Sequence, residues 1–241
     1  MITPTLTSRS EFLAVTGDHP FVALYSSERL SAYQGENAWV WVSDGPWGAL
    51  TVGLGDGAAA LDLLAELQAA GLAEGGRLHA PRVPREAVLE RFAAHQFGEW
   101  DQMWSTTPPP ATKGEELVEW LPAEAAPDID KLLDESLPDS SVRPGKVGVR
   151  DWYGIREDDR LVAVAADRSA NGVGLVAGIA VAPDQQGRGL GAAVTVATTR
   201  RLLSRYATVS LAVMSDNERA IRLYDRLGYT SAVARTSFDL T

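Results

Sequence analysis

A glycine-rich stretch between a predicted strand and a predicted helix constrains the fold more than any other part of this sequence. Residues 173–181 form an apolar run typical of a buried strand, and a helical pattern follows over residues 189–205. Between them, residues 186–191 read QGRGLG, with glycine at every second position. Glycine lets the backbone adopt conformations that a Cβ atom would block. The pattern therefore predicts a tight strand–loop–helix unit.

The first turn of this predicted helix is a candidate anion site. Its N–H groups have no acceptor within the helix, and they lie at the positive end of the helix dipole. Phosphate and diphosphate groups bind in this arrangement in many proteins.

Three kinds of phosphate loop compete for this stretch. A nucleoside-triphosphate loop ends in Gly-Lys-Ser/Thr, whereas two alanines follow Gly191. A dinucleotide fingerprint, G-x-G-x-x-A, does match residues 187–192, but residues 183–186 separate its first glycine from the strand. Too little chain follows for the further strand–helix units of that fold. The third pattern, Q/R-x-x-G-x-G/A, fits residues 186–191 better.

This third pattern resembles the acyl-CoA diphosphate loop of the GNAT (GCN5-related N-acetyltransferase) family. Residues 215–229 strengthen the likeness, because they resemble the family segment N-x-x-A-x-x-x-Y-x-x-x-G-F/Y. Taken alone, this segment is an amphipathic helix with Asn217 as its N-cap and Gly228 just beyond its end. The resemblance covers residues 117–240 and is strongest over 173–229.

The resemblance implies acetyl-CoA as the co-substrate. Its pantetheine arm would lie between the strand 173–181 and the strand 208–214, and the glycine loop would hold its diphosphate. The residues assigned to cofactor binding in this way are Ile179, Val181, Gln186, Gly187, Arg188, Gly189, Leu190, Gly191, Ala192, Asn217, Ala220 and Tyr224.

The same resemblance implies a catalytic role for Tyr224. An amine would attack the thioester, a backbone N–H would polarise its carbonyl, and Tyr224 would protonate the departing thiolate. A purely structural core tyrosine is the alternative. Many family members carry a carboxylate base on the strand before the loop, but residues 173–181 contain none. Asp216 or Ser215 is expected to serve as the base through water.

The first half of the chain repeats the order of elements predicted for the second half. Residues 38–106 and 152–238 both run hairpin, glycine turn, helix, strand, helix, strand, and a second glycine turn occurs at 53–57. We interpret this as a degenerate internal repeat, with chance similarity of two α/β units as the alternative.

A proline-rich linker, residues 108–114, is expected to separate two domains. The predicted boundaries are 1–107 for a degenerate GNAT-like domain and 115–241 for the acetyltransferase domain. Such a tandem resembles the glycine N-acyltransferase-like subgroup. The predicted fold class is α/β with an α+β mixed sheet in each unit.

The composition of the chain indicates which partners and cofactors are not expected. The chain has no cysteine and a net charge of −10, and it shows no metal-ligand spacing. Acidic proteins bind nucleic acid poorly. With no signal peptide or membrane-spanning run apparent, a cytoplasmic monomer or homodimer is expected, without membrane or nucleic-acid partners or a metal.

The function predicted is N-acetyl transfer from acetyl-CoA to an amine of a small molecule or amino acid. An acyl-CoA-binding sensor or scaffold without turnover is the alternative.

Overall fold

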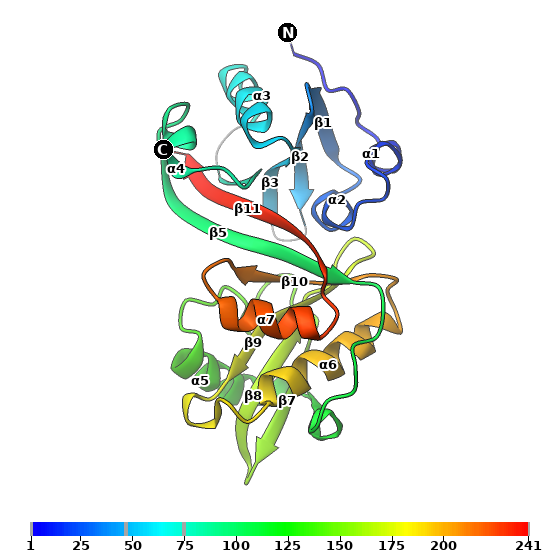
Figure 1. The fold of residues 1–241 in the computed structure, drawn as a ribbon, viewed down its shortest axis with the longest axis vertical. Helices are drawn as coiled ribbons and strands as arrows, with labels where there is room; N and C mark the ends of the chain where they lie inside the picture. The colour runs from blue at the N-terminus through cyan, green and yellow to red at the C-terminus, as the bar shows by residue number, and fades with distance from the viewer. Residues whose placement is uncertain (1, 46–47, 74–75, 241) are drawn as a thin grey trace. The chain divides into compact units, whose positions relative to one another are not determined.

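The computed structural model describes residues 2–45, 48–73 and 76–240, which fold into two compact units (Figure 1). Both units are discontinuous in sequence. Unit 1 takes in Met1–Gln102, Val213–Glu218 and Ala232–Thr241, and unit 2 takes in Met103–Ala212 and Arg219–Ser231.

Unit 1 is a mixed sheet with helices on both faces. Its strands are neighbours in the order β1-β2-β3-β4-β11-β5. The elements are α1 (Arg9–Val15), α2 (Pro20–Tyr25), β1 (Leu30–Gly35), β2 (Ala38–Gly45), β3 (Gly48–Gly55), α3 (Gly57–Ala69), β4 (Arg77–Pro81), α4 (Arg85–Leu89), β5 (Ala94–Ser105) and β11 (Ser231–Leu240).

The alternation of side chains along β2 explains why helices pack on both faces of the unit 1 sheet. Val40 joins a core cluster with Leu61, Leu64 and Leu67 of α3. The next residue, Trp41, therefore lies on the other face. There its ring meets Phe12 of α1 and Phe21 of α2 at centroid distances of 5.3 and 6.1 Å.

Unit 2 is also a mixed sheet. Its strands are neighbours in the order β10-β9-β8-β7-β6, and only β9 and β10 are parallel. The elements are η1 (Glu115–Leu117), β6 (Glu119–Leu121), η2 (Ala123–Ala125), α5 (Ala126–Ser136), β7 (Asp151–Glu157), β8 (Arg160–Asp167), β9 (Gly174–Val181), η3 (Pro183–Gln185), α6 (Leu190–Leu203), β10 (Val209–Met214) and α7 (Glu218–Arg226).

Helix α5 covers one face of the unit 2 sheet. Its Ile129, Leu132 and Leu133 cluster with Val164 and Ala166 of β8. Helix α6 packs on β7, β8 and β9. A Cβ atom on Gly174 of β9 would lie 3.2 Å from Leu202 Cβ of α6, which sets how closely this helix approaches the strand.

These observations confirm the predicted α/β class with mixed sheets. Both units contain a parallel strand–helix–strand unit, β3-α3-β4 and β9-α6-β10, at the positions of the two glycine turns. The predicted boundaries, 1–107 and 115–241, imply consecutive domains. That division stays a prediction. From Ala232 on, β11 belongs to unit 1, where it pairs with β4 from Arg235–Pro81 to Asp239–Arg77.

Helices in the described ranges are all too short or too polar to cross a membrane.

Candidate functional site

The parallel strands β9 and β10 part within unit 2. Their pairing runs from Gly174–Val209 to Val176–Leu211 and goes no further. Strand β9 continues to Val181 while staying paired with β8. The second half of β9 therefore has one backbone edge that β10 does not cover.

A β-bulge marks the point where β9 leaves β10. Ala177 lies opposite Ala166 of β8, but Ala180 lies opposite Val164, so β9 carries one extra residue there. Both Ala177 and Ala180 pack on the α5 side, although residues three apart in a regular strand face opposite sides.

Gly178 makes this bulge. Its φ of +56° is a conformation that other residues adopt only under strain. A Cβ atom there would also lie 3.1 Å from Trp152 Cη2 and 3.1 Å from Val142 Cγ1. A glycine inside an apolar strand is a known signal for a bulge, but β9 also contains Gly174, so the sequence alone does not point to Gly178.

The two β9 residues expected to pair with a ligand lie at or beyond this bulge. The N–H of Ala182 donates to Val162 of β8 at 2.9 Å. Because backbone groups alternate in direction along a strand, the N–H and C=O of Val181 face away from β8. Val181 and Ile179 are both half-buried. The uncovered edge can thus offer a hydrogen-bond donor and acceptor to an extended ligand.

The glycine loop needs glycine because of its backbone conformation, and not because neighbouring atoms leave no room for a side chain. Gly187 and Gly189 have φ values of +83° and +87°. A Cβ atom on either would meet no atom within 4 Å, so both face open space. At Gly191 a Cβ would lie 3.6 Å from Val181 Cγ2, an ordinary contact.

The start of α6 is uncapped. Gly189 is the N-cap residue and provides no side-chain acceptor, and the N–H of Ala193 makes the first helical bond, to the Gly189 carbonyl at 3.0 Å. The N–H groups of Leu190, Gly191 and Ala192 therefore precede the first acceptor of the helix. No acidic residue lies in this turn. An anion is the ligand that such a turn binds best.

Arg188 does not add free positive charge to the loop in this structure. Its Nη1 and Nη2 bind the carboxylate of Glu157 at 2.7 and 2.9 Å, and Gln185 accepts a further hydrogen bond. The hydrogen bond and charge of Glu157 raise the pKa of Arg188. Gln186 is exposed beside it.

Helix α7 has the predicted ends. It begins at Glu218, directly after Asn217, and Ala220 in its first turn is half-buried. Gly228 has a φ of +92°, and the N–H of Tyr229 donates to the Tyr224 carbonyl at 3.0 Å. This geometry ends a helix at glycine, as the sequence pattern predicts.

Tyr224 is buried in unit 2 with 7% of its surface exposed. Its ring meets that of Tyr229 edge to face, with centroids 6.2 Å apart. The Tyr229 hydroxyl is in turn hydrogen-bonded to Thr199 of α6 at 2.6 Å. Burial raises the pKa of Tyr224 to about 12, so this phenol is protonated at neutral pH and can donate a proton.

Ser215 and Asp216 belong to unit 1, unlike Tyr224. The Ser215 hydroxyl donates to Asp101 at 2.7 Å and accepts from Arg82 Nη2 at 2.5 Å. It therefore takes part in a structural ionic cluster. Asp216 is exposed to solvent.

The described part of the chain gathers no three histidine or acidic side chains into a group that could hold a metal ion.

Residues 152–237 match the model of the family described as FR47-like protein. A mycothiol acetyltransferase from Nocardiopsis dassonvillei is 30% identical over 176 residues, which cover 66% of this chain and 50% of that protein. A mycothiol acetyltransferase from Rhodococcus jostii is 47% identical over 58 residues, covering 24% and 19% of the two chains. The chain thus spans half or less of the length of these relatives.

Solved structures share the fold over most of the chain. A putative GNAT acetyltransferase from Novosphingobium aromaticivorans has a TM-score of 0.57 at 22% identity, covering 87% of this chain and 90% of that one. A GCN5-related N-acetyltransferase from Kribbella flavida has a TM-score of 0.53 at 17% identity, covering 98% and 96%. These matches show a GNAT fold, and with the family match they support the GNAT resemblance.

Proposed function

We propose that this chain is a GNAT N-acetyltransferase that transfers the acetyl group of acetyl-CoA to an amine of a small molecule or amino acid. One observation carries the proposal: in unit 2 the uncovered edge of β9 is followed, after the loop 182–189, by the uncapped start of α6. An extended amide-bearing arm that ends in a diphosphate fits such a pair of sites.

The residues present fit acetyl-CoA in two ways. Val181 and Ile179 lie on the edge that β10 leaves, where the amides of a pantetheine arm would find backbone partners. The N–H groups from Gly187 to Ala192 lie around the open loop and first helical turn, where no side chain fills the space next to Gly187 or Gly189. Gln186, Asn217 and Ala220 are proposed to complete this surface.

When bound, acetyl-CoA would supply a thioester carbonyl to the attacking amine. Tyr224 would then provide a proton for the thiolate, since its raised pKa keeps the hydroxyl protonated. The backbone N–H groups near the β9 bulge would stabilise charge that develops on the carbonyl oxygen.

The proton of the attacking amine also needs an acceptor. Strand β9 carries no carboxylate. The Ser215 hydroxyl is held by Arg82 and Asp101, which makes it a poor base. Asp216 is exposed, and we propose that it receives the proton through water.

A small acceptor is favoured over a protein. Both relatives described above carry the name mycothiol acetyltransferase, which denotes a small-molecule acceptor. The likeness to the glycine N-acyltransferase-like subgroup points the same way and stays a prediction. We also propose that the protein acts in the cytoplasm without a metal, as a monomer or homodimer.

The lack of a carboxylate on β9 favours a second candidate, an acyl-CoA-binding sensor or scaffold without turnover. Such a protein would bind acetyl-CoA through the same edge of β9 and the same helix start, and would release no CoA when amines are added.

A charge placed in the glycine loop tests the proposed site. Acetyl-CoA should raise the Tm of the protein and NAD should not. Gly189→Glu should abolish that rise, because a carboxylate at the helix start repels the diphosphate. Gly172→Glu is the matched control, since Gly172 has a φ of +83° against +87° at Gly189 and also faces open space. Loss of the rise in both variants, or in neither, would argue against this site.

A further inference from the structure

Unit 1 contains its own pair of parting parallel strands. Strands β3 and β4 pair in parallel at Thr51–Leu78 and Val52–His79, and the pairing goes no further among the described residues. This repeats the arrangement of β9 and β10, where pairing ends at Val176–Leu211. Unit 1 therefore has the backbone framework of a second cofactor cleft.

The side chain of Arg235 occupies the point where β3 and β4 part. Its Nη2 atom donates to the Gly53 carbonyl and to the His79 carbonyl, each at 2.5 Å. These are the backbone acceptors that an extended ligand would use between two parting strands. A side chain from the last strand, β11, takes the place of that ligand.

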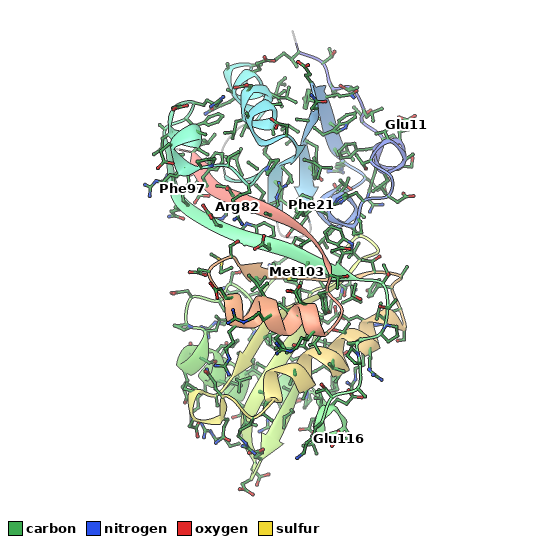
Figure 2. The ribbon with its side chains drawn as sticks, viewed as in Figure 1. Glu11, Phe21, Arg82, Phe97, Met103 and Glu116 are labelled. Atoms are coloured by element: carbon green, nitrogen blue, oxygen red, sulfur yellow. The ribbon has the colours of Figure 1, made fainter. Side chains whose placement is uncertain are left out.

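The side chain of Arg235 is buried there like that of a core residue. Only 1% of its surface is exposed. Its guanidinium lies 4.3 Å from the ring centroid of Phe21, which comes from α2 and is labelled in Figure 2. Within the described ranges its Nε atom has no hydrogen-bond partner, and no carboxylate is among the groups that shift its pKa. An unpaired cation this deeply buried is costly, so its two carbonyl bonds are its main compensation.

The helix start in unit 1 is also occupied. Asp56 caps α3, and its carboxylate accepts the N–H of Ala59 at 2.9 Å. The corresponding helix in unit 2 begins at Gly189 with no side-chain cap. A carboxylate at this point repels a diphosphate, which would need the same N–H groups.

The glycine turn of unit 1 also has less free space around it than the glycine loop of unit 2. A Cβ atom on Gly57, in the glycine turn of unit 1, would lie 2.5 Å from Val83 Cγ1. A Cβ atom on Gly187 or Gly189 of unit 2 would meet no atom within 4 Å. The turn of unit 1 is therefore packed against its own chain, whereas the loop of unit 2 is open.

We infer that unit 1 holds a second, closed cofactor cleft whose occupants are the chain's own Arg235 and Asp56, so that each chain binds one acyl-CoA. The identity of the excluded ligand rests on the proposed function. The filling of the cleft rests on the contacts of Arg235 and Asp56 alone.

Hydrogen–deuterium exchange of the whole, unmodified protein tests this inference. Acetyl-CoA should slow exchange in peptides covering residues 176–192 and leave those covering 48–57 and 77–83 unchanged. Native mass spectrometry should show one acetyl-CoA per chain. Slowed exchange over 48–57, or two acetyl-CoA per chain, would overturn the inference. No change over 176–192 would instead overturn the proposed function.

Substitution of Arg235 tests the internal occupant without any ligand. Arg235→Met keeps much of the side-chain volume but leaves the Gly53 and His79 carbonyls without donors. Exchange over 48–57 and 77–83 should then become faster, and the Tm should fall. Arg235→Lys, which restores a donor, should recover part of both losses. Unchanged exchange and Tm in Arg235→Met would show that the guanidinium does not hold the cleft. Should Arg235→Met fail to fold, the measurement on the unmodified protein still decides.

Discussion

The substitution Tyr224→Phe tests whether Tyr224 donates a proton in the reaction or is only a structural core residue. The substitution keeps the ring and its edge-to-face contact with Tyr229, whose centroid lies 6.2 Å away. It removes a hydroxyl whose pKa is raised to about 12 by burial. At pH 8 only about one such phenol in 10⁴ is ionised, so the donor is available throughout the neutral range.

The expected loss follows from the role of a general acid. Such groups contribute about 10²–10⁴-fold to the rate, and a thiolate leaves fairly well without help, so kcat should fall by about 10²-fold. That is about 2.7 kcal/mol of transition-state stabilisation. The folded state should lose little, because Phe keeps the ring contact with Tyr229 and burial is the one cause behind the raised pKa of the Tyr224 hydroxyl.

Tyr229→Phe is the matched control. Its hydroxyl is hydrogen-bonded to Thr199 at 2.6 Å, so its removal should cost about 1 kcal/mol of unfolding free energy and little kcat. The two variants should thus show opposite patterns in a thiol-release assay and in urea unfolding. Full kcat in Tyr224→Phe at pH 7.5 would refute the reasoning and make Tyr224 a core residue.

Three further changes should each affect one measured property. Gly178→Ala should lower the unfolding free energy by about 1–3 kcal/mol in urea titration, because the φ of Gly178 is +56° and a Cβ atom there would crowd Trp152. Unchanged stability would show that alanine fits the bulge without strain. Burial lowers the pKa of His79 to about 3, so stability present above pH 6.5 is lost as the pH falls. At pH 5 this loss should reach up to about 2 kcal/mol, and His79→Asn should show a shallower pH dependence between pH 7 and 5. Glu157→Gln should release Arg188 and tighten acetyl-CoA binding by about two- to fivefold in titration calorimetry, whereas weaker binding would show that the pair orders the loop.

The local patterns of unit 2 could be predicted from sequence because short-range chemistry determines them. Positive φ values at Gly187, Gly189 and Gly228, and the start of α7 after Asn217, follow from glycine and cap preferences. Burial of Tyr224 follows from its place on the apolar face of that helix.

Features that depend on distant parts of the chain could not be predicted in this way. Pairing of β11 with β4 joins residues more than 150 positions apart, and no local signal marks it. The same pairing brings Arg235 to Gly53 and His79, so the sequence could not predict that Arg235 fills the space between β3 and β4. Likewise, the bond between Arg188 and Glu157 depends on how β7 lies beside the loop.

Amine-dependent release of CoA from acetyl-CoA tests the central claim most directly. The whole protein would be incubated with acetyl-CoA and a panel of small amines and amino acids, with the free thiol measured and each product identified by mass spectrometry. We predict thiol release that depends on at least one amine and matches the amount of N-acetylated product, and that is lost in Gly189→Glu but kept in Gly172→Glu. Acetyl-CoA binding without amine-dependent release across the panel would contradict the claim and favour a sensor or scaffold.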